Sequence, residues 1–194
     1  NKMNINLMVD FIMGTIKKPD DCKTMIKKIK NLKKFKITWI EEPFHPDDFY
    51  SFKKLSKKSL KIPIASGEAL NSIFEYKSYI SNKLVDILQL DVTHCGGITE
   101  AIKILSLLKN TNKKVALHVW GSLISLSANA HLAHAFKNVK WLECPLHQPE
   151  LNKDFNTTVD FSKNIKDQKI KSGLGINLNP KMIKKYPYVV GSEY

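Results

Sequence analysis

The stretch ITWIEEPF, residues 37–44, decides the fold, because an apolar strand-like run leads directly into two acids. The same pattern returns along the chain, where apolar runs end in Ser66-Gly67-Glu68, in Asp91 and in His118. Short apolar runs that alternate with helical stretches predict a parallel sheet, and in barrels of this kind the carboxyl ends of the strands carry the chemistry. We therefore interpret these polar residues as parts of one site.

Strand and helix patterns alternate along most of the chain. Strands are predicted at residues 5–10, 37–42, 62–68, 85–92, 114–119 and 139–144, and helices at 23–35, 49–59, 72–83, 98–108 and 123–136. Residues 145–194 break this rhythm, with a strand pattern at 173–176 and a short helix that begins at Asn179-Pro180. We expect residues 1–145 to form a partial (β/α) barrel and residues 146–194 to form a tail that packs back on the protein.

Six strands fit two architectures. A complete (β/α) barrel needs eight strands and typically about 250 residues, whereas this chain has 194. The chain is therefore either an open α/β sheet of six strands or the later part of a barrel whose first two strands lie on a preceding segment.

Composition indicates a globular, cytoplasmic protein. The chain is 43% hydrophobic and has no run of about 18 apolar residues, and its first residues lead into a strand pattern rather than a signal peptide. Cys22, Cys95 and Cys144 are odd in number and widely spaced, which fits a reducing compartment. The formal charge of +13 comes from lysines without any arginine. With no recognition motif beside it, this charge predicts neither a nucleic-acid partner nor a membrane.

Side chains alternate along a strand, so one set of polar residues should face one mouth. The parity groups Ile87 and Gln89 with Asp91, Met8 with Asp10, Trp39 with Glu41, Ser66 with Glu68, and Ala116 with His118. An ordinary salt bridge would explain any one of the acids. Three carboxylates from successive strands, Asp10, Glu41 and Glu68, would repel one another unless a cation joined them, and hard oxygen ligands favour Mg²⁺.

These residues resemble the strand-end signatures of the enolase superfamily, in its mandelate racemase and muconate lactonizing enzyme-like branch, which contains many acid-sugar dehydratases. The resemblance rests on WIEEP (39–43), ASGE (65–68), QLD (89–91) with the following Gly96-Gly97, and HVWGS (118–122). It implies strands 3 to 8 of a TIM-type barrel plus a C-terminal tail. The N-terminal capping domain and the first two strands would then precede Asn1.

The resemblance also implies roles for the polar residues. Asp10, Glu41 and Glu68 would be Mg²⁺ ligands, His118 a general base or acid, Asp91 its orienting partner, and Glu143 a substrate contact opposite the metal. The implied reaction is dehydration of a sugar acid through α-proton abstraction, an enediolate stabilised by Mg²⁺, and loss of the β-hydroxyl, a mechanism general to this superfamily. The implied partners are the carboxylate substrate, the missing N-terminal segment and, at full length, further copies in a homo-oligomer.

The sequence alone leaves alternatives to a dehydratase open. A racemase or epimerase would use the same enediolate, and the chain could instead be a non-catalytic barrel fragment or an assembly module. The family often has Asn two residues after the first metal-binding Asp, whereas this chain has Ile12 there. The family's second-strand Lys-x-Lys would also precede Asn1, so the chain alone is expected to carry part of an active site.

Overall fold

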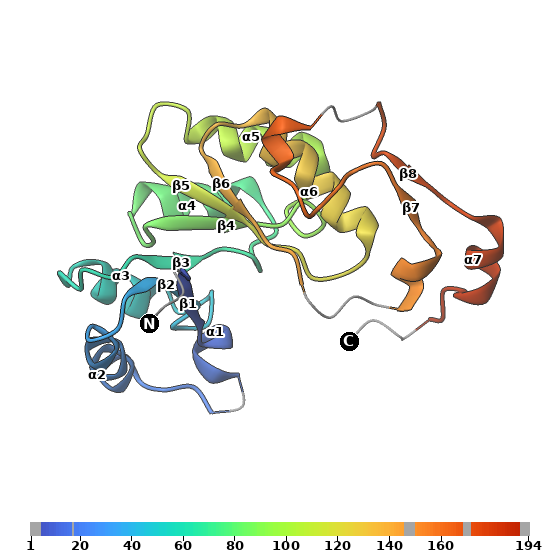
Figure 1. Cartoon of the computed structure of the whole chain (residues 1–194). Helices are drawn as coiled ribbons and strands as arrows, with labels where there is room; N and C mark the ends of the chain where they lie inside the picture. The colour runs from blue at the N-terminus through green and yellow to red at the C-terminus, as the bar shows by residue number, and fades with distance from the viewer. Residues whose placement is uncertain (1–4, 17, 146–149, 169–171, 191–194) are drawn as a thin grey trace.

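The computed structural model describes residues 5–16, 18–145, 150–168 and 172–190. Its main sheet consists of β1 (Leu7–Asp10), β2 (Ile37–Glu41), β3 (Ile64–Ser66), β4 (Ile87–Leu90), β5 (Lys114–Leu117) and β6 (Val139–Leu142). The strands are all parallel and lie in chain order (Figure 1). A doubly wound sheet would reverse its order at a switch point. The six predicted strands are confirmed, and their order is that of consecutive barrel units.

Helices connect the strands and cover one face of the sheet. They are α2 (Cys22–Leu32), α3 (Phe49–Ser56), α4 (Ile73–Ser81), α5 (Gly97–Leu107) and α6 (Leu123–Ala135). The four-residue α1 (Ile12–Thr15) is a left-handed turn in the loop after β1 rather than a regular helix. Local capping explains where they begin, since Asp21 accepts hydrogen bonds from the first backbone N–H groups of α2, and Ser72 forms a capping box with Glu75 at α4. Between helices and sheet lies a buried apolar core that includes Phe52 and Tyr76.

The sheet curls into a partial barrel. Trp39 on β2 and Trp141 on β6 are four strands apart, which would separate them by roughly 19 Å in a flat sheet. Their ring centroids are 4.9 Å apart. A second, smaller core of Trp39, Ala65, Ile87 and Ala116, with Met8 and Trp141 packed against it, fills the concave side. This packing selects the barrel over the open sheet, and a partial TIM-type barrel is the fold of the chain.

Strand β3 departs from the predicted parity. Ala65 pairs with Glu41 and Ile87 and belongs to the concave core, so its neighbours Ile64 and Ser66 face the helices. The prediction that Ser66 shares a face with Glu68 was wrong. The strand ends at Ser66, and Gly67 turns the chain with a φ of 126° before Glu68.

The tail contains the short elements η1 (Glu150–Asp154), β7 (Asn156–Thr157), η2 (Ile165–Asp167), β8 (Ile176–Asn177) and α7 (Pro180–Lys185). Strands β7 and β8 pair antiparallel to each other. The tail contacts the barrel through α6, where Asn152 accepts a hydrogen bond from the backbone of Leu123 at 2.8 Å and His134 contacts the carbonyl of Ile165 at 3.2 Å. None of the helices in the described ranges has the length and apolarity that crossing a bilayer requires.

Candidate active site

The predicted site residues all lie at the carboxyl ends of the strands. They are the last residues of β1 and β2 (Asp10, Glu41), the residues directly after β4, β5 and β6 (Asp91, His118, Glu143) and the second residue after β3 (Glu68). Parallel strands in register bring their ends to one edge, which we call the mouth. The structure therefore gathers residues that are up to 133 positions apart in the sequence.

His118 and Asp91 form a hydrogen-bonded pair in the mouth. Nδ1 of His118 lies 2.9 Å from Oδ2 of Asp91, whose side chain is fully buried. Oδ1 of Asp91 accepts hydrogen bonds from the backbone and hydroxyl of Thr93 and from the amide of Asn129. Burial acts to raise the pKa of Asp91, but these hydrogen bonds and that from His118 together lower it. The carboxylate is thus held charged and fixes the imidazole with Nδ1 as the donor.

The other nitrogen of His118 faces two acids. Nε2 lies 3.7 Å from Oε1 of Glu68 and 3.8 Å from Oε2 of Glu143, which also accepts the backbone N–H of Val119 at 2.9 Å. Burial lowers the pKa of His118, but Asp91 and the two acids outweigh it and raise the pKa to about 9. This nitrogen can exchange a proton with a molecule in the mouth.

The acids of the mouth repel one another. Burial raises the pKa of Glu68 to about 8, with His118 opposing and the charges of Glu42, Glu41 and Asp10 adding to the rise. Burial also raises the pKa of Asp10, and Glu41 contributes. Oε2 of Glu68 is buried and has no hydrogen-bond partner among the described residues. A group of carboxylates in this state favours a cation as neighbour.

The proposed ligand side chains do not converge on one point in this structure. Within the described ranges, no three His, Cys, Asp or Glu side chains lie close enough together to hold an ion. Oε2 of Glu41 instead accepts a hydrogen bond from the indole of Trp39 at 2.9 Å. The donor set still fits Mg²⁺, because it consists of hard carboxylate oxygens at one mouth and includes the unpartnered oxygen of Glu68.

The sequence did not identify two buried residues, Asn129 and Glu42, that form hydrogen bonds beside the site residues. Asn129 on α6 is fully buried, donates to Asp91 at 3.2 Å and accepts the backbone N–H of Val92 at 3.2 Å. The only sequence signal was a single Asn within an Ala- and Leu-rich helical pattern, and this signal does not identify its partner. Glu42 was passed over in favour of Glu41, although its side chain is only 1% exposed and is hydrogen-bonded.

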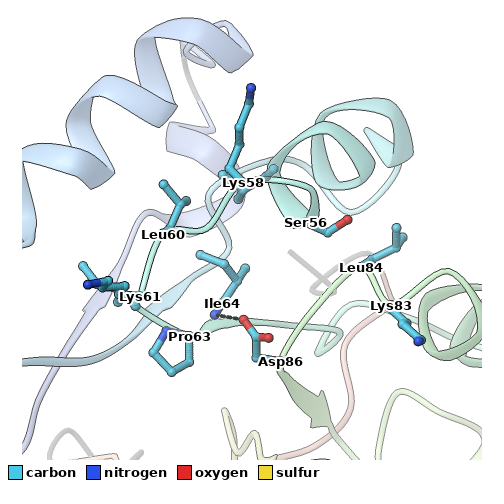
Figure 2. A pocket seen from close by; sticks show the side chains of 11 residues that line it. Ser56, Lys58, Leu60, Lys61, Pro63, Ile64, Lys83, Leu84 and Asp86 are labelled. Carbon is cyan, nitrogen blue, oxygen red and sulfur yellow. Dashed lines mark hydrogen bonds between the residues drawn. The ribbon is translucent and has the colours of Figure 1, made fainter.

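Two hollows lie at opposite ends of the strands. One, of about 290 Å³, opens on the concave side and is lined by Met8, Trp39, Glu41 and Glu143 among others. The other, of about 350 Å³, lies at the amino ends of β3 and β4, where Asp86 accepts the backbone N–H of Ile64 at 2.9 Å (Figure 2). Its lysines point away from one another in Figure 2 and form no common binding point. Catalysis in such barrels belongs to the carboxyl end, so the first hollow is the substrate-side candidate.

The fold and the mouth together define a partial TIM-type (β/α) barrel with its polar groups at the carboxyl ends of the strands. The chain belongs to the enolase C-terminal domain-like family, which it matches over residues 2–182.

Curated relatives of the chain include dehydratases. L-talarate/galactarate dehydratase of Salmonella typhimurium strain LT2 is 30% identical over 159 residues, covering 82% of this chain and 38% of that protein. Arabinonate dehydratase of Saccharolobus solfataricus is 29% identical over 158 residues, covering 81% and 42%. The chain thus spans less than half the length of these relatives.

Solved structures share the fold. The 3,6-anhydro-D-galactonate cycloisomerase from Zobellia galactanivorans is 27% identical with a TM-score of 0.81, over 94% of this chain and 50% of that one. L-talarate/galactarate dehydratase from Salmonella typhimurium LT2, liganded with Mg and L-lyxarohydroxamate, is 29% identical with a TM-score of 0.75, over 93% and 43%.

Proposed function

We propose that the complete protein is a Mg²⁺-dependent lyase that dehydrates a sugar acid. The observation that carries the proposal is His118, fixed by Asp91 on one nitrogen and facing the acids of the mouth with the other. The dehydratases among the relatives, which are named for sugar acids, support the reaction class.

In this proposal His118 moves the proton. Nε2 of His118 takes the proton from the substrate α-carbon or gives one to the leaving β-hydroxyl, so that water departs and an enol remains. The enol then loses its hydroxyl proton and takes up a proton at C3, which gives the 2-keto-3-deoxy acid. Asp91 keeps Nδ1 protonated and stabilises the imidazolium, as an orienting carboxylate does in other His-dependent enzymes. Glu143, which is half-exposed at the end of β6, contacts the substrate on the side opposite the metal.

We assign Asp10, Glu41 and Glu68 as the residues that would hold Mg²⁺. A bound cation would supply positive charge to stabilise the negative charge that develops on the substrate carboxylate. The repulsion among these acids and the unpartnered oxygen of Glu68 support the assignment.

We also propose that residues 1–145 carry the chemistry, residues 146–194 pack on the barrel, and a preceding segment of the same protein completes both barrel and site. The matches cover half or less of each relative cited above, and β1 and β6 are the two end strands of the sheet. The three free cysteines support a cytoplasmic setting.

The test is a screen of the complete polypeptide with Mg²⁺ against a panel of sugar acids. A 2-keto-3-deoxy acid, detected as its semicarbazone, is expected from at least one of them, and the His118→Asn variant serves as the background. Epimerised substrate without keto acid would assign a racemase or epimerase instead. Neither product, across a panel that includes aldonic and aldaric acids, would reject the lyase.

A further inference from the structure

Glu42 follows the proposed metal ligand Glu41, but its side chain is buried and bonded to the turn after β1. The side chain is 1% exposed and its backbone has a φ of 38°, in the left-handed region. We infer that Glu42 is a positioning residue, whose buried carboxyl holds the turn after β1 and thereby orients Asp10. The inference rests on the proposed function only where Asp10 is taken as a metal ligand.

The turn after β1 needs to be held from outside. Ile12, Met13, Gly14 and Thr15 have φ values of 45°, 52°, 69° and 71°. For residues with a side chain this region is unfavourable, so three such residues around one glycine persist only where surrounding contacts fix them.

Glu42 and its neighbours supply those contacts. Oε2 of Glu42 accepts the backbone N–H of Met13 at 3.0 Å, and the Glu42 carbonyl accepts that of Gly14 at 2.8 Å. At Gly14, a Cβ would lie only 2.9 Å from the carbonyl oxygen of Pro43, so the two loops touch at the backbone. The loop after β2 is therefore the support on which the turn rests.

The turn after β1 also fixes the side chain of Asp10. The backbone N–H of Ile12 donates to Oδ1 of Asp10 at 2.7 Å, one residue before the amide that Glu42 binds. The path runs from the Glu42 carboxyl through Met13 and Ile12 to the Asp10 carboxylate. Removing the Glu42 side chain releases the turn, and Asp10 loses the donor that fixes its direction.

The first test measures Mg²⁺ affinity of the complete polypeptide by calorimetry. Glu42→Ala is expected to weaken binding by about tenfold, since the hydrogen bond from Met13 to the buried carboxyl is lost. Glu42→Gln keeps an acceptor for Met13 and should bind within about threefold of wild type. Asp86→Ala is the matched control, because it removes a carboxylate bonded to a backbone N–H at the other end of the sheet and should leave the affinity unchanged. A folded Glu42→Ala protein with wild-type affinity, or equal losses in Glu42→Ala and Glu42→Gln, would overturn the inference.

The second test does not depend on the metal. Amide exchange at Ile12 and Met13, followed by NMR without Mg²⁺, should accelerate by about tenfold in Glu42→Ala and not in Glu42→Gln. Unchanged protection in Glu42→Ala would refute the positioning role, whereas accelerated exchange in a protein that never binds Mg²⁺ would refute the metal site alone. If Glu42→Ala does not fold, adding Met13→Gly should restore folding, because glycine tolerates the left-handed backbone. Failure of that rescue would show that the turn is not what Glu42 supports.

Discussion

His118 depends on Asp91 for both its direction and its charge, because the two side chains share a hydrogen bond of 2.9 Å inside the mouth. In the complete enzyme, His118→Asn should abolish exchange of the substrate α-proton on the face that His118 serves. Asp91→Asn should slow exchange by about 10²- to 10⁴-fold, since an amide no longer fixes the tautomer. Incorporation of solvent deuterium, followed by NMR, measures both. Wild-type incorporation on that face in the His118 variant would show that another group is the base.

Carboxylates that repel one another in the apo protein should make Mg²⁺ a stabilising ligand. At a concentration of a hundred times Kd, a ligand that binds only the native state adds about 2.7 kcal/mol, a rise in Tm of roughly 5–10 °C at this size. Glu68→Gln should remove most of that rise. Glu100→Gln, on the outer helix α5, is the matched control and should keep it. Thermal melts with Mg²⁺ and with chelator measure the effect, and equal midpoints in the wild type would count against the site.

Asp91 should also make the protein sensitive to acid. Its pKa is lowered in the folded state despite burial, by hydrogen bonds from His118, Thr93 and Asn129. A folded pKa below the unfolded value means that the stabilisation is present above about pH 3.9 and is lost as the pH falls through the folded pKa. Urea unfolding between pH 2 and 5 should show a steeper loss in wild type than in Asp91→Asn. Parallel curves would mean that the carboxylate is not stabilised by these contacts.

The ionisable residues of the mouth could be predicted from the sequence because each ends an apolar run. The supporting residues could not, since Asn129 reaches Asp91 from a helix 38 positions away and nothing in its local pattern identifies that partner. Glu42 was hidden for a different reason. Glu42 comes directly after the last residue of β2, and strand alternation does not show that its side chain binds a backbone turn.

At the scale of the elements, β3 shows where alternation stops being informative. The sequence pattern predicts alternating side-chain directions through residues 62–68, but the hydrogen-bonded strand β3 covers only Ile64–Ser66. Gly67 then leaves the extended conformation, with a φ of 126°, and resets the direction of Glu68. Glu68 consequently reaches the mouth by a turn rather than by parity.

Gly67 should therefore be intolerant of substitution. A Cβ at Gly67 would lie 2.6 Å from the carbonyl oxygen of Gln89 on β4, and the φ is itself unfavourable for alanine. Gly67→Ala should lower the free energy of unfolding by about 2–4 kcal/mol and should weaken the response to Mg²⁺ by displacing Glu68. Gly97→Ala is the control, because its φ is 88° but nothing lies within 4 Å of the added Cβ, so about 1 kcal/mol is expected. Similar losses from both variants, in urea unfolding, would contradict the proposed clash.

At the scale of the whole molecule, the rhythm of strands and helices predicted the architecture, but it could not choose between an open sheet and a barrel. That choice depends on curvature, and curvature is set by contacts across several strands, such as that between Trp39 and Trp141. No local sequence pattern predicts which side chains on the concave side of the sheet will contact one another. The prediction of a barrel therefore rested on the resemblance to the enolase superfamily. The packing of the concave core confirms that prediction.

The open ends of the sheet lead to the last prediction, which concerns the 194-residue chain expressed by itself. Strands β1 and β6 each have a neighbour on one side only within the main sheet, and at the β1 end Ile5 and Leu7 are 63% and 50% exposed. An uncovered parallel edge with apolar side chains invites pairing with another chain. We therefore expect the chain alone to self-associate and to show no turnover. The complete polypeptide should turn over substrate and should not associate through this sheet edge.

Size-exclusion chromatography and the keto-acid assay on both proteins provide the measurement. Leu7→Lys is the informative variant, because a charge on a half-exposed edge position should reduce association of the chain alone without emptying the core. It should not restore activity, since the barrel remains incomplete. A monomeric 194-residue chain that dehydrates a sugar acid unaided would show that the six-stranded half-barrel is sufficient, and the proposed requirement for a preceding segment would then be wrong.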